Sequence, residues 1–119
     1  MRATAPEICP PDWEQTLCTI ILHAGNARSA AKEAGELAAA GHWEEAEGAL
    51  QKAEEEQLAA HKMQAEILHK EARGEKVPFS ILLVHALDLL LLAWAEIDYA
   101  RQFLTLYQRL YALENEARK

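Results

Sequence analysis

The strongest candidates for chemistry in this sequence are a histidine and an aspartate inside its most apolar stretch. His85 and Asp88 are the only polar residues between Ile81 and Ala95. A separation of three positions places both on one face of a helix. A neutral imidazole is a competent nucleophile toward phosphorus, because a pKa of about 6.5 leaves a ring nitrogen free in most molecules at neutral pH. The pair is therefore compatible with a phosphohistidine intermediate.

The same pair also has interpretations that involve no phosphoryl transfer. One makes His85 a hydrogen-bonded core histidine with Asp88 as its counter-ion. Another makes them metal ligands, but a tight site needs three or four protein ligands, so other subunits or His61 would have to contribute. The remaining histidines lie in ordinary settings and receive no role here: His23, His42 and His69.

Size, charge and cysteine content exclude several classes of protein. The 119 residues fit one domain spanning residues 1–119. Twelve Lys and Arg against 19 Asp and Glu give a net charge of −7, and this acidity would repel nucleic acid. Two cysteines without C-x-x-C spacing suggest neither a disulfide framework nor a zinc site, which fits a reducing cytoplasm. No glycine-rich loop or G-x-S-x-G motif indicates a nucleotide-dependent kinase or a serine hydrolase.

No segment of the sequence has the pattern of a secretory signal or a membrane span. The N-terminus is rich in proline, with no continuous apolar stretch after Arg2. The stretch from Ile81 to Ala95 is shorter than the roughly 20 residues that a bilayer requires, and it contains His85 and Asp88. We expect a buried helix there, and a cytoplasmic protein with no direct membrane insertion.

Apolar periodicity predicts three helices and no strands. Apolar residues recur at steps of three and four from Trp13 to Ala38, which indicates a helix over about 12–40. A second helix is expected over 43–73 and a third over 79–114. Gly41 and Gly74 follow the first two helices as stop signals. The short connections make neighbouring helices antiparallel, so the predicted fold is an all-α, antiparallel three-helix bundle.

Two of the predicted helices carry unusual faces. Gln57, His61 and Gln64 follow one another at steps of four and three, which places a short polar strip on or beside the packing face of the second helix. The third helix is apolar nearly all round between Ile81 and Ala95. Two partner helices can hardly cover such a helix, so we expect an oligomer whose size the periodicity does not decide.

Four segments together resemble the lactose/cellobiose-family enzyme IIA component of the sugar phosphotransferase system. They occur in the order and spacing of that family and extend over most of the chain: His23-Ala-Gly-Asn-Ala-Arg-Ser29, His61-Lys-Met-Gln64, Glu71-Ala-Arg-Gly-Glu75 and Pro78-Phe-Ser-Ile-Leu-Leu-Val-His-Ala-Leu-Asp88.

The resemblance implies a function, an assembly and a set of partners. It makes His85 the phosphorylated residue, which receives phosphate from phospho-HPr and passes it to the cognate IIB component during uptake of a disaccharide. It further implies a homotrimer, with Asp88 of each subunit gathered around a divalent cation, expected to be Mg²⁺, at the trimer axis. His61 and Gln64 are assigned as supporting residues.

The sequence departs from the family pattern beside the expected nucleophile. The family usually has His-Ala-Gln-Asp-His, whereas this chain has Leu87 and Leu89 in place of the glutamine and the second histidine. Two polar groups that could stabilise phosphate or handle protons are thus missing. An alternative function is a non-catalytic or regulatory helical oligomer, in which His85 and Asp88 serve only assembly.

Overall fold

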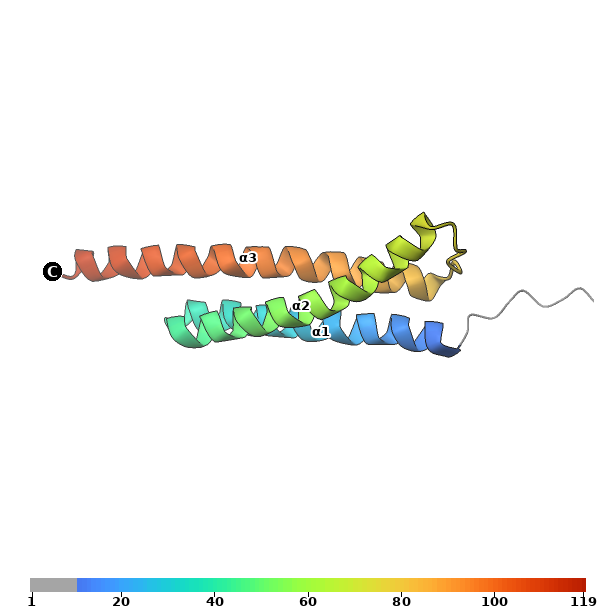
Figure 1. The fold of residues 1–119 in the computed structure, drawn as a ribbon. Helices are drawn as coiled ribbons and strands as arrows, with labels where there is room; N and C mark the ends of the chain where they lie inside the picture. The colour runs from blue at the N-terminus through green and yellow to red at the C-terminus, as the bar shows by residue number, and fades with distance from the viewer. Residues whose placement is uncertain (1–10) are drawn as a thin grey trace, which may run out of the picture.

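A computed structural model describes residues 11–119 as three long helices. Helix α1 extends over Pro11–Ala39, α2 over Trp43–Ala72 and α3 over Ile81–Ala117. The α1 and α2 helices form a hairpin, and α3 returns parallel to α1 (Figure 1). The chain is therefore an up-down-up bundle in which the first turns of α1 and α3 lie at the same end. The all-α bundle expected from periodicity is confirmed.

The core is built mainly from alanine. Along α1, buried residues at steps of three and four present their side chains to both other helices, and small side chains let the helix axes approach closely. Among the residues that the structure describes, the largest fully buried side chains are Leu17, Ile20, Leu50 and Leu90. The α1 helix packs extensively on α2 and α3, whereas α2 and α3 touch each other much less.

The helix ends follow from identifiable local signals. Gly41 and Gly74 both adopt positive φ angles, +83° and +89°, which glycine tolerates without the steric cost that other residues incur. The Ser80 hydroxyl accepts a hydrogen bond of 3.0 Å from the Leu83 backbone N–H and so caps α3. This cap places the start of α3 at Ile81, two residues later than predicted, and the helix continues three residues further than predicted.

Gly41 also lies against the far part of α3. A Cβ atom on Gly41 would meet the Tyr111 hydroxyl oxygen at 2.8 Å, so only glycine leaves room for this phenol. Tyr111 packs edge-on against Trp43, with ring centroids 5.0 Å apart. These contacts fix the position of the α1–α2 turn along α3.

A polar pair joins α1 to α2 at mid-length. The His23 Nδ1 atom and the Glu56 Oε2 atom lie 2.6 Å apart, and both side chains are partly buried. The hydrogen bond with His23 holds the pKa of Glu56 below its ordinary value, against the opposing effect of burial. No local spacing in the sequence signalled this pair, because its members lie 33 residues apart.

Replacing Glu56 by Gln should lower the free energy of unfolding by about 1 kcal/mol at pH 7. A carboxyl with a lowered pKa in the folded state stabilises the fold above the ordinary pKa of glutamate, about 4.3, and loses that contribution as pH falls through the lowered value. The difference between the two proteins in urea unfolding should therefore shrink below about pH 4. Glu55→Gln, at the exposed neighbouring position, is the control, and an equal loss in both variants would contradict the role of the pair.

Candidate phosphoryl-transfer site

The third helix carries two apolar faces, and this arrangement positions the candidate site. One face is buried against α1 and α2: Ala86, Leu90, Ala93, Ile97, Ala100 and Leu104. The opposite face is exposed, and we call its large apolar residues the outer stripe: Ile81, Val84, Leu91, Leu92, Tyr99, Phe103, Leu106, Leu110 and Leu113. We expected a buried helix from Ile81 to Ala95. Within one chain this expectation is wrong, because α1 and α2 cover only one side of that stretch.

His85 and Asp88 lie in the N-terminal part of α3, on its exposed side. At 3.6 residues per turn, Asp88 projects from the middle of the outer stripe, with Val84 one turn before it and Leu92 one turn after it. His85 projects about 60° away, toward α1. The structure therefore brings the two together on one surface, as the spacing predicted, but that surface is open.

Neither residue has the partner that a core interpretation requires. Among residues 11–119, no ion pair involves His85 or Asp88. The exposed position of both side chains also removes the need for a counter-ion that burial would create. This subunit therefore does not contain the buried pair of His85 and Asp88 that the non-catalytic interpretation supposed.

The two residues expected to support His85, His61 and Gln64, both belong to α2. Both are half-buried in α2. The His61 and Trp94 rings form a T-shaped pair, with centroids 5.1 Å apart. Trp94 follows His85 by nine residues, about two and a half turns, so it projects from the opposite side of α3. Within one subunit the structure does not bring His61 to His85, and its supporting role stays a prediction.

The two leucines that replace polar residues of the family pattern are both half-buried. Leu89 packs against the larger of the two core clusters, one turn beyond His85. Leu87 projects toward the other flank of α3. The immediate surroundings of His85 within one subunit are thus more apolar than the family pattern would make them.

Asp88 is the carboxylate that projects from among the apolar residues of the outer stripe. Within the described residues, no three His, Cys, Asp or Glu side chains gather closely enough to hold a metal ion. A divalent cation prefers several oxygen ligands. Asp88 could fit such a cation only when other copies of the chain supply further oxygens.

The comparisons with known proteins bear directly on this site. The family described as "PTS system, Lactose/Cellobiose specific IIA subunit" matches residues 15–108, a segment that includes His85 and Asp88. The chain belongs to this family. The family assignment made from the four sequence segments is thereby confirmed.

Individual relatives cover nearly the whole chain. The lichenan-specific phosphotransferase enzyme IIA component of Bacillus subtilis is 43% identical, over 83% of this chain and 90% of the relative. The cellobiose-specific EIIA component of Lactococcus lactis is 38% identical, over 88% of this chain and 90% of the relative. The crystal structure of the cellobiose-specific enzyme IIA from Bacillus anthracis superposes with a TM-score of 0.82 at 41% identity, over 94% of this chain and 95% of that one.

These likenesses make this IIA-family chain a component of the sugar phosphotransferase system. Among residues 11–119, no helix is both long enough and apolar enough to cross a bilayer.

Proposed function

We propose that this chain is a cytoplasmic phosphoryl carrier for disaccharide uptake, accepting phosphate from phospho-HPr on His85 and passing it to a IIB component. The observation that carries the proposal is the exposure of His85 near the start of α3. An imidazole in that position is accessible to a partner protein, which a core histidine would not be. The likeness to lichenan-specific and cellobiose-specific components supports cellobiose or a related oligosaccharide as the transported sugar.

The proposed transfer is a substitution at phosphorus. A ring nitrogen of neutral His85 forms a bond to phosphorus while the bond between phosphorus and the donor atom of phospho-HPr breaks, and the donor atom keeps the electron pair. Transfer to the IIB component repeats the step with His85 as the leaving group. No sugar contacts this chain in either step.

The start of α3 favours a phosphorylated His85. The first turn of α3 carries no acidic residue, so no carboxylate there opposes the negative charge of the phosphoryl group. Side chains of a helix lean toward its N-terminus, where the helix dipole is positive. Both effects favour the phosphoryl group on this side chain, and the Asp88 carboxylate, three positions later on the same surface, opposes them.

Mass spectrometry of the intact chain tests the proposal. After incubation with phosphoenolpyruvate, enzyme I and HPr, we expect the mass of one phosphoryl group to be added. The adduct should be lost in acid and kept in base, because a phosphoramidate hydrolyses when its nitrogen is protonated. A reaction without HPr is the control. A chain that never gains this mass would support the alternative of a non-catalytic helical oligomer.

We further propose that three copies assemble through their outer stripes. A groove of about 1040 Å³ runs along the α1–α3 seam and borders the stripe. Its lining includes Tyr99 and Phe103 of the stripe and Gly25 and Gly35 of α1. Small residues of this kind allow a helix of a second copy to approach closely. In such a trimer, Asp88 of each subunit would meet at the axis and hold a divalent cation such as Mg²⁺.

Light scattering behind a sizing column should give three times the chain mass of 13.3 kDa. Leu92→Glu should shift the protein toward the monomer, because each copy would place a further charge inside the apolar interface. Leu68→Glu is the matched control, since Leu68 is an exposed leucine of α2 outside the stripe. A native chain that is monomeric at micromolar concentration would contradict the trimer.

A further inference from the structure

The second groove of the subunit lies between α2 and α3 and is separate from the site at His85. It has a volume of about 250 Å³. Its lining comes from one face of each helix: Glu54, Gln57, Leu58 and His61 of α2, and Trp94, Ile97, Asp98 and Arg101 of α3. Trp94 projects about 120° around α3 from Asp88, so this groove opens away from the middle of the outer stripe.

Two buried polar atoms of this lining lack hydrogen-bond partners. Gln57 is 7% exposed, and its Nε2 atom donates a hydrogen bond of 3.2 Å to the Leu90 carbonyl oxygen. Within the described part of the chain, neither the Gln57 Oε1 atom nor the His61 Nδ1 atom has a partner. A buried polar group without a partner is costly and uncommon. Because Oε1 only accepts hydrogen bonds, the group that would satisfy it must be a donor.

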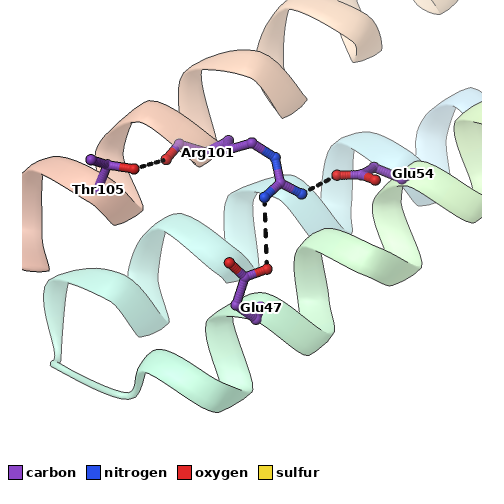
Figure 2. Close-up of polar contacts among 4 residues, drawn as sticks. All are labelled: Glu47, Glu54, Arg101 and Thr105. Carbon is purple, nitrogen blue, oxygen red and sulfur yellow. Dashed lines mark hydrogen bonds and ion pairs between the residues drawn. The ribbon is translucent and has the colours of Figure 1, made fainter.

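The charges around the groove favour a positively charged donor. Arg101 is held between two carboxylates of α2, as Figure 2 shows, with its Nη1 atom 3.7 Å from Glu47 Oε2 and its Nη2 atom bonded to Glu54. The hydrogen bond with Glu54 also raises the pKa of Arg101. Asp98 adds a second carboxylate to the lining of the groove, beside that of Glu54. Two lining carboxylates against one guanidinium leave the groove net negative, which disfavours an anion.

Trp94 supplies an aromatic surface for a cation. Its side chain is 46% exposed, so part of the indole is open to solvent. Tryptophan attracts cations to the face of its ring more strongly than the other aromatic residues do. The groove thus combines an open indole, an unsatisfied buried acceptor and excess carboxylate, all of which a primary ammonium group can satisfy with three N–H donors.

We propose that the α2–α3 groove binds a primary alkylammonium group, with the charge beside Asp98, the alkyl chain on Trp94 and one N–H directed to Gln57 Oε1. The ammonium can belong to a free small amine or to a lysine side chain of another protein. A neutral polyol could also donate hydrogen bonds, but it would leave the negative charge of the groove uncompensated.

Titration with n-butylammonium chloride, followed by the three tryptophan indole N–H signals in an ¹H–¹⁵N correlation spectrum, tests the proposal. The Trp94 signal, assigned from its loss in Trp94→Phe, should shift saturably. The Trp43 signal, from the distant contact with Tyr111, should stay constant. n-Butanol, which has the same chain without the charge, should not shift the Trp94 signal saturably. A blocked lysine tripeptide forms a second arm, and the tighter of the two ligands identifies the source of the ammonium.

Two substitutions make the test specific for the groove. Asp98→Asn should weaken butylammonium binding by about fivefold, as expected for removal of one charge partner near the surface. Gln57→Leu should weaken it as well, while Glu33→Gln, which removes one charge from the exposed side of α1, should not. Equal shifts of Trp94 and Trp43, equal binding of butanol, or an unchanged affinity in Asp98→Asn would overturn the proposal. The affinity of Asp98→Asn for butylammonium tests the proposal even if Gln57→Leu does not fold.

Discussion

His85→Gln is expected to abolish phosphorylation of the chain by phospho-HPr. Glutamine fills a similar volume and can still donate and accept hydrogen bonds, but its amide nitrogen has no free lone pair with which to attack phosphorus. Because His85 is exposed and makes no ion pair among residues 11–119, the substitution should leave the fold and its stability nearly unchanged. Intact mass after incubation with the donor proteins measures the first effect, and circular dichroism checks the second.

His69→Gln is the matched control for this experiment. His69 is exposed near the end of α2 and has no part in the proposed site, so the variant should accept phosphate as the native chain does. A phosphoryl group that persists on His85→Gln but disappears from His69→Gln would transfer the role of nucleophile to His69.

Asp88→Leu is expected to raise the melting temperature of the assembled protein by roughly 5 °C or more. Three carboxylates at an axis within an apolar stripe repel one another, and each loses hydration, unless a cation or bound protons offset the cost. Leucine removes both penalties and continues the stripe between Val84 and Leu92. The variant should also lose the response to added Mg²⁺ and to chelator that the native protein is expected to show.

Differential scanning calorimetry with Mg²⁺ and with chelator separates this arrangement from its alternatives. Asp98→Leu serves as the control, because Asp98 is an exposed aspartate of the same helix that lines the α2–α3 groove. It should keep the response to divalent ions. A lower melting temperature for Asp88→Leu, with the chelator response unchanged, would count against a cluster of three Asp88 side chains at an axis.

Local patterns in the sequence were sufficient to predict the three helices and their order. Steps of three and four located α1, and the glycines expected to stop the first two helices both adopt positive φ angles. The spacing of His85 and Asp88 correctly placed them on one surface, because neighbours on a helix depend only on its pitch. The same pattern could not show that this surface is open, since exposure depends on where the other helices pack.

Contacts between distant residues were the part that the sequence did not reveal. In the acidic run at 54–56, Glu54 bonds to Arg101 and Glu56 to His23. Their partners lie 47 and 33 residues away. The polar strip on α2 was recognised from spacing. The contact of His61 with Trp94, on the flank of α3 away from His85, could not be recognised in this way. It depends on how α2 and α3 are rotated against each other.

The two opposite faces of α3 limit how the length of this helix can vary. One residue inserted or deleted near Ala93 would rotate everything beyond it by about 100°. Leu104 would leave the core, Leu106 would leave the outer stripe, and Tyr111 would swing away from Gly41. One change would therefore break intrachain packing, the proposed interface and the anchoring of the α1–α2 turn together. Length changes should be tolerated instead at the exposed residues 75–76, between Gly74 and the capped start of α3, or after Leu113, the last residue of the outer stripe.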